Sequence, residues 1–307
     1  SPTATAPADS ASPPDTEKAM RPPARNRSPN PPKTTTATAT GPAADDEAAN
    51  NATLPFEIEG RKVRTLSLQE LRARIPPVEF TQHDPYYHQT KTYLALPLAP
   101  VLQAGFEGRD IVLEAQHFVL RARDGYTVPL EGKRLVEDGG HIAIDDLDVA
   151  DGWQPIGKQE ADPGPFYLVW SGDDQLDLTV HPRPWQLAEI EVSRFESSFP
   201  KVVPEGAGEA AQRGFAIFRE QCIRCHAINQ QGGKVGPELN VPQSIVEYRD
   251  PALLKRYIKN PSSFRYGNMP DNPPLPAGNL DDLIAYFTAM SERKDDPKRG
   301  DARGAGH

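Results

Sequence analysis

Cys222-Ile223-Arg224-Cys225-His226 is the stretch of sequence that decides how the C-terminal part of this chain folds. Two cysteines two residues apart, followed at once by a histidine, form the C-x-x-C-H pattern of covalent haem attachment. Each thiol adds across one haem vinyl group, and the two intervening residues set the sulfurs apart to match the two vinyls. The histidine then lies under the iron and supplies an imidazole nitrogen. The pattern therefore predicts one covalently bound haem c.

Three other uses of a C-x-x-C pair fit this sequence less well. A zinc ribbon needs two further ligands, but the chain of 307 residues has only these two cysteines. A thioredoxin-like motif is expected near a βαβ pattern, and none is visible in the sequence. A disulfide across two residues would be strained. Because the haem motif uses both cysteines, we expect no disulfide framework.

The surroundings of the motif, residues 207–291, resemble a mono-haem class I cytochrome c domain, which is an all-α fold. Four further stretches carry the resemblance in the family's order. They are Gly214-Phe215-Ala216-Ile217-Phe218 within an expected helix over 209–221, Gly236-Pro237-Glu238-Leu239, Asn268-Met269-Pro270, and an expected helix over 279–290 that contains Tyr286-Phe287. The resemblance implies that Gly214 lets the first helix cross the last one closely.

The family's pattern gives roles to two further residues, one that supports the histidine ligand and one that is itself a ligand. The carbonyl of Pro237 is expected to accept a hydrogen bond from the ring of His226, which fixes the ring and its tautomer. Met269 matches the loop that carries the second axial ligand. The other two methionines fit that role poorly, because Met20 lies in a tail without apolar neighbours and Met290 ends the last helix.

Ligation by His226 and Met269 raises the reduction potential and fills both axial positions of the iron. It therefore argues against oxygen or peroxide chemistry at the haem, and we expect no catalytic residue there. Arg265, four residues before Met269, is a candidate partner for a haem propionate. The alternative for Arg265, a solvated arginine in a loop, stays open.

The two ends of the chain have a different composition. Residues 1–53 consist largely of Pro, Ala, Thr and Ser, so they cannot bury enough apolar surface to offset the entropy of ordering. We expect a disordered tether there, either a leash to a membrane anchor or a plain tail. Residues 292–307 are expected to form a disordered polar tail.

Residues 54–204 are expected to form a strand-rich α+β domain. Alternating apolar and polar residues predict strands, and Ser67 with Glu70 three residues later predicts a capping box at the start of a short helix. A second short helix is expected over 97–105. The expected strands begin near Phe56, Val78, Ile111, Phe118, Ile142, Phe166 and Leu187.

The order of motifs in this domain resembles the molybdopterin-binding domain of the sulfite oxidase type. The matching stretches are short and lie at 94–98, 122–130, 151–155, 164–170 and 184–192. The active members of that family bind molybdenum through a cysteine thiolate, but residues 1–221 contain no cysteine. Without that soft ligand a molybdenum centre is not expected. We therefore predict a domain without molybdopterin that serves docking or architecture, while a pterin held without a metal stays open.

Charge and hydropathy narrow the possible partners. The net charge is −9, which gives no sign of a nucleic-acid partner, and no apolar run is long enough to cross a bilayer. About 25 acidic against about 15 basic residues over 54–206 form either a surface that steers a basic partner or a solubilising one. Because bacterial haem c attachment occurs outside the cytoplasmic membrane, the resemblance implies a periplasmic protein. No signal peptide is present, so we expect a processed or trimmed N-terminus.

These observations favour a periplasmic di-domain cytochrome c that carries single electrons between a donor complex or dehydrogenase and an oxidase or another cytochrome. The expected partners are redox proteins, with possible tethering to a membrane through the N-terminal segment. Two alternatives stay open. One is a haem-containing dehydrogenase that oxidises a small oxyanion such as sulfite through its N-terminal domain. The other is a structural subunit of a membrane redox complex, in which the haem is secondary.

Overall fold

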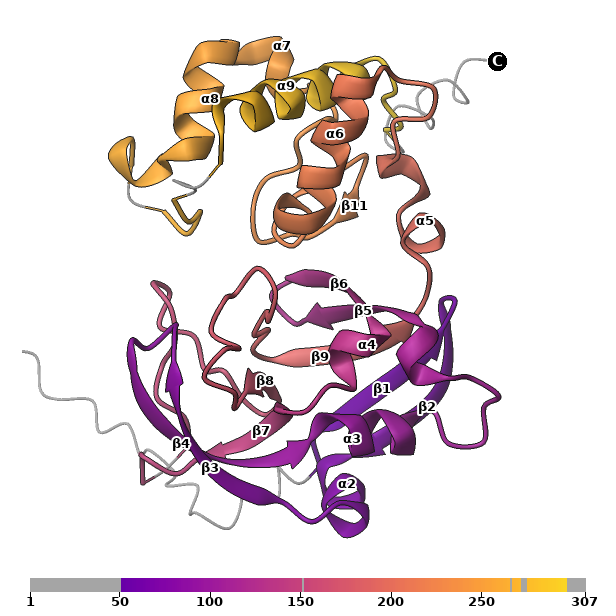
Figure 1. The fold of residues 1–307 in the computed structure, drawn as a ribbon, viewed down its shortest axis with the longest axis vertical. Coiled ribbons are helices and arrows are strands. Elements are labelled where there is room, and N and C mark those ends of the chain that lie inside the picture. The colour runs from indigo at the N-terminus through magenta and orange to yellow at the C-terminus, as the bar shows by residue number, and fades with distance from the viewer. Residues whose placement is uncertain (1–50, 151, 266, 272–274, 297–307) are drawn as a thin grey trace, which may run out of the picture. The chain divides into compact units, whose positions relative to one another are not determined.

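The computed structural model describes residues 51–150, 152–265, 267–271 and 275–296 (Figure 1). These residues fall within one compact unit of the chain. The expected tails over 1–53 and 292–307 lie mostly outside the described residues. The first strand begins at Thr53, one residue before the expected start of the N-terminal domain.

The N-terminal domain contains two β-sheets, which confirms its strand-rich character. Five strands form one sheet in the order β2-β1-β9-β5-β6, and four form the other in the order β3-β4-β7-β8. Neighbouring strands are antiparallel except β1 and β9, which are parallel. The strands are β1 (Thr53–Ile58), β2 (Arg61–Ser67), β3 (Val78–Asp84), β4 (Gln89–Pro97), β5 (His117–Ala122), β6 (Thr127–Glu131), β7 (Gly140–Asp146), β8 (Tyr167–Trp170) and β9 (Leu187–Val192).

Short helices connect these strands and close the domain. They are α2 (Leu68–Arg74), α3 (Leu98–Gly105), the 3₁₀ turn η1 (Leu113–Ala115), α4 (Gly132–Leu135), α5 (Phe195–Ser198) and the 3₁₀ turn η2 (Pro200–Val202). The capping box predicted from Ser67 and Glu70 is present, because the Ser67 hydroxyl accepts from the Glu70 amide and the Glu70 carboxylate accepts from the Ser67 amide.

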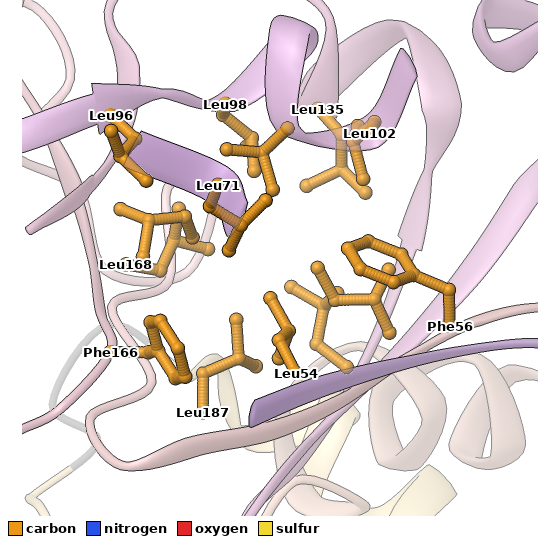
Figure 2. Packing of buried hydrophobic residues seen from close by; sticks show 14 of the residues in the cluster. Leu54, Phe56, Leu71, Leu96, Leu98, Leu102, Leu135, Phe166, Leu168 and Leu187 are labelled. Carbon is orange, nitrogen blue, oxygen red and sulfur yellow. The ribbon is translucent and has the colours of Figure 1, made fainter. Parts of the chain in front are cut away.

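The main core of this domain draws on both sheets. Leu54 of β1, Leu187 of β9 and Leu168 of β8 are buried in one apolar cluster with residues of α2 and α3 (Figure 2). Because successive residues of a strand point to opposite faces, only alternate residues of β1 reach this core, and its sequence shows that alternation. Burial of this cluster is the main favourable contribution to folding of the domain.

Strand β8 is buried on both faces. Leu168 and Trp170 belong to the main core, whereas Tyr167 and Val169 belong to a second apolar cluster on the other face of the sheet. Although β8 is the last strand of its sheet, residues 182–184 cover its free edge. The backbone amide of Leu168 donates to the carbonyl of Pro184 at 3.1 Å, as in a sheet. The side chain of Trp170 adds a bond from its indole N–H to the carbonyl of Pro182 at 3.0 Å.

One predicted strand is wrong. The alternation that begins at Ile111 predicts a strand, but the chain there forms the turn η1 (Leu113–Ala115). Val112 is 67% exposed, whereas Ile111 and Leu113 pack half-buried against the main core. The stretch thus buries its apolar side chains without pairing with another strand. Three strands were not predicted. Strand β2 carries too few apolar residues to show a period, β4 carries polar residues over its first half, and β6 is short and contains Pro129, a residue that argues against a strand.

The C-terminal domain is helical, as expected, apart from a small hairpin of two short strands. Its elements are α6 (Glu209–Ile217), the π-helical turn η3 (Phe218–Cys222), β10 (Ala227–Ile228), β11 (Gln231–Gly232), α7 (Ile245–Tyr248), α8 (Pro251–Lys259), the 3₁₀ turn η4 (Pro261–Ser263) and α9 (Ala277–Ser291). No helix among the described residues is both long and apolar enough to cross a membrane.

Helices α6 and α9 cross at Gly214. A β-carbon on Gly214 would lie 2.0 Å from the carbonyl oxygen of Asp282, so only glycine allows the two backbones to approach this closely. One turn further along, the ring of Phe218 packs on that of Tyr286 with centroids 5.2 Å apart. The close crossing expected from the resemblance is therefore present.

We expect Gly214→Ala to lower the free energy of unfolding by about 1–3 kcal/mol, because the added methyl overlaps the α9 backbone. Intrinsic helix propensity alone would change it by up to about 1 kcal/mol in the opposite direction, so the sign separates the two effects. Urea unfolding followed by helical circular dichroism measures it. The exposed Ala216→Ser on the same helix is the control, and a Gly214→Ala protein as stable as wild type would contradict the packing argument.

Candidate functional site

The two cysteines lie on one turn of helical backbone. Cys222 ends the π-helical turn, and the amides of Cys225 and His226 both donate to its carbonyl, at 3.1 and 2.9 Å. π-helical turns inside α-helices are frequent at functional sites. Both thiols are free, and burial raises the pKa of Cys222 to about 12 and that of Cys225 to about 11. Each side chain is therefore a neutral thiol in this structure.

The ring of His226 is fixed by the loop that follows it. Its Nδ1–H donates to the carbonyl of Pro237 at 2.9 Å. Burial lowers the pKa of His226, which favours the neutral ring and leaves Nε2 with a free lone pair. A β-carbon on Gly236 would lie 2.4 Å from Cε1 of the ring, so the backbone passes directly against one face of the imidazole.

The carboxylate of Glu238 holds this loop in place. Its Oε1 accepts from the amides of Asn229, Asn240 and Val241 at 2.8 to 3.1 Å, and its Oε2 accepts from the amide of Gln230 at 2.9 Å. Four backbone donors on both sides of the loop therefore share one side chain. This arrangement fixes the position of Pro237, and with it the acceptor for His226.

A buried amide pair connects the same loop to the last helix. The side-chain amide of Asn240 donates to Oδ1 of Asn229 and to the carbonyl of Met290, each at 2.8 Å. The side-chain amide of Asn229 donates in turn to the carbonyl of Arg293 at 2.9 Å. The loop that contains Pro237, Glu238 and Asn240 is thus hydrogen-bonded to the end of α9.

Met269 lies in a loop at the edge of the C-terminal apolar cluster. It is half-buried and packs against the same cluster as Cys222. Asp271 connects this loop to the 3₁₀ turn η4, because its carboxylate accepts hydrogen bonds from the amide and the hydroxyl of Ser262 at 3.0 and 2.7 Å. These two hydrogen bonds hold the pKa of Asp271 below its usual value. The neighbouring Tyr266 lies outside the described residues.

Arg265 is exposed and already has a contact. Its Nε donates to the hydroxyl of Tyr257 at 3.1 Å, and its guanidinium lies 5.6 Å from the centre of that ring. The side chain therefore rests on α8. A role in holding a haem propionate stays a prediction.

The chemistry of these residues fits a covalently attached haem. Cys222 and Met269 border one apolar cluster. Cys225 supplies a second free thiol, and the imidazole of His226 has one uncommitted nitrogen. Within the described part of the chain, no group of three or more His, Cys, Asp or Glu side chains is arranged to hold a metal ion.

Comparison with known families supports this assignment. Residues 209–287 match the family model described as cytochrome C oxidase, cbb3-type, subunit III. The C-terminal part of this chain is a cytochrome c domain. Such a domain implies haem c and indicates electron transfer, and domains of this kind are typically found outside the cytoplasm.

The match covers less than half of the chain and contains Cys222, Cys225, His226, Pro237 and Met269. It includes no part of the N-terminal domain, so the resemblance of that domain to the sulfite oxidase type stays a prediction. No curated protein matches the chain.

Sequence reasoning gave no role to two residues that the structure makes prominent. Glu238 lies inside the quoted stretch 236–239, where a carboxylate in a short Gly-Pro loop is well placed to accept hydrogen bonds from backbone amides. Arg224 is one of the two variable positions of the haem motif, and nothing in the sequence distinguishes it from an exposed arginine. Only its contacts, described below, show its position.

We expect Glu238→Gln to lower the free energy of unfolding by about 1–3 kcal/mol, because an amide has only one oxygen, so at least one of the four backbone donors loses its acceptor and the others lose the carboxylate charge. Thermal unfolding of the haem-loaded chain measures this loss. Glu220→Gln, at an exposed position of the same domain, removes one charge in the same way and should change stability by less than about 0.5 kcal/mol. Equal effects of the two substitutions would contradict the anchoring role.

Proposed function

We propose that this chain is a single-electron carrier with one haem c. Cys222 and Cys225 form the two thioether bonds, and His226 and Met269 are the axial ligands of the iron. Haem supplies one-electron chemistry between its ferrous and ferric forms. The protein supplies attachment, ligands and an apolar surrounding that tunes the potential.

The observation that carries this proposal is the hydrogen bond from Nδ1 of His226 to the carbonyl of Pro237. A histidine that ligates a metal usually donates its other ring N–H to a carbonyl or carboxylate, which orients the ring and strengthens it as a donor. An imidazole directly after C-x-x-C and already held in this way is prepared to bind iron through Nε2.

Met269 as the second ligand explains why a carrier is favoured over an enzyme. With both axial positions filled by side chains, no position is open for a substrate or for oxygen, and the reduction potential is raised. The protein then exchanges electrons only with other redox centres. We propose a periplasmic location, with a redox protein as donor and another as acceptor, and a docking role for the N-terminal domain.

We expect Cys222→Ala to prevent formation of stable holoprotein. One of the two covalent bonds to haem is lost, and the haem is then no longer held against the apolar cluster that Cys222 borders. The measurement is haem-associated peroxidase staining of the full-length chain after denaturing electrophoresis. Gln221→Ala, at the exposed preceding position, should retain the stain. Full-length Cys222→Ala protein with a complete haem complement would refute the attachment site.

We expect Met269→Ala to lower the reduction potential, within the roughly 0.8 V range that axial ligands span, and to open the iron to added ligands such as imidazole. Redox titration and the visible spectrum with and without imidazole measure both effects. Met290→Leu changes the buried methionine of α9 while keeping its volume, so it should leave the potential and the spectrum unchanged. An unaltered spectrum and potential in Met269→Ala would rule out Met269 as a ligand.

A further inference from the structure

Arg224, between the two cysteines, directs its side chain to the N-terminal domain. It is only 9% exposed. Its Nη1 donates to the carbonyl of Leu178 at 2.8 Å, and its Nη2 donates to the carbonyl of Thr179 at 2.6 Å. Both acceptors lie in the loop between β8 and β9. The haem motif itself requires no arginine at this position, so the contact serves a purpose other than attachment.

Two backbone hydrogen bonds strengthen the same junction. The amide of Thr127 donates to the carbonyl of Arg224 at 2.9 Å, and the amide of Lys234 donates to the carbonyl of Gly125 at 3.0 Å. Gly125 lies in the turn between β5 and β6, and Thr127 is the first residue of β6. This part of the N-terminal domain is therefore bonded to Arg224 within the haem motif and to Lys234, two residues before Gly236.

Two half-buried phenols of the N-terminal domain, those of Tyr86 and Tyr126, lie within electrostatic range of Arg224 and Cys225, and burial raises the pKa of both phenols. Tyr86 packs in turn against the edge of Trp185, with ring centres 5.1 Å apart. Aromatic residues of the N-terminal domain are therefore found on the same side as the contacts of Arg224.

The N-terminal domain also reaches the loop of the second ligand. The ammonium of Lys158 donates to the carbonyl of Gly267 at 2.7 Å, two residues before Met269. Contacts to the attachment segment and to the methionine loop thus come from one domain. That domain therefore contacts both chain segments that carry the proposed haem ligands.

We propose that Arg224 is a latch by which the N-terminal domain caps the Cys225 side of the haem and keeps water and outside redox partners away from it. This inference rests on the proposed function, since it assumes haem at Cys222 and Cys225. Arg224 acts as a positioning residue: its guanidinium fork fits two adjacent carbonyls, and each bond from a charged donor stabilises the junction more than a neutral one. Electrons then pass over the uncapped surface of the cytochrome domain.

Amide hydrogen exchange on the haem-loaded full chain tests the latch. In Arg224→Ala, the amides of Thr127 and Lys234 should exchange roughly tenfold faster, because they are protected only while the two domains touch. Arg224→Lys keeps the charge but loses the fork and should give a smaller increase. Arg213→Ala removes an exposed ion pair with Asp282 inside the cytochrome domain and should leave both amides unchanged.

The oxidation rate of the ferrous protein by ferricyanide tests the cap. Ferricyanide accepts one electron from the ferrous haem and becomes ferrocyanide without binding the iron. Opening of the latch exposes the Cys225 side, so this rate should rise severalfold in Arg224→Ala and remain at the wild-type value in Arg213→Ala. A purely structural role of Arg224 within the attachment segment would not change the exchange of Thr127.

Unchanged exchange and an unchanged oxidation rate in haem-loaded Arg224→Ala would overturn the latch and leave the proposed function intact. If Arg224→Ala takes up no haem, Arg224→Lys decides: faster exchange supports the latch and wild-type exchange refutes it. A wild-type chain that carries no covalent haem overturns the proposed function and, with it, the cap.

Discussion

The hydrogen bond between the His226 ring and the Pro237 carbonyl depends on most of the C-terminal domain. Pro237 is held by the loop that Glu238 gathers through four backbone amides, and this loop is tied through Asn240 to the end of α9. Helix α9 is in turn positioned by its close crossing with α6, which leads directly to Cys222. The ring orientation, the attachment segment and the packing of the two long helices are therefore parts of one arrangement.

The N-terminal domain has no assigned chemistry, yet the structure gives it a clear relation to the haem site. Three of its parts contact the two segments that would hold haem: residues 125–127, the loop at 178–179 and Lys158. A domain that covers one side of a redox centre limits the directions from which a second centre can come close. The docking role toward outside partners, which the sequence suggested, stays a prediction, and the contacts that the structure shows are within this chain.

The C-terminal domain could be predicted in some detail, because C-x-x-C-H and Gly214 are required by covalent chemistry and by backbone contact that few other residues allow. The N-terminal domain was predicted less well. Its apolar alternation located β9 and most of β1, but the same signal at Ile111 was wrong, since burial is set by what packs there and not by the local sequence. The pairing of the strands into two sheets, and the interdomain contacts of Arg224, depend on residues far apart in the chain.

The covering of β8 by residues 182–184 has a consequence for association between copies of this chain. An edge strand presents unpaired amides and carbonyls that can template pairing with another molecule, and β8 is apolar on both faces. The segment that covers it contains Pro182 and Pro184, which have no amide hydrogen to donate and so cannot extend the sheet further. A strand that is apolar on both faces is thereby covered by residues that stop the sheet from growing.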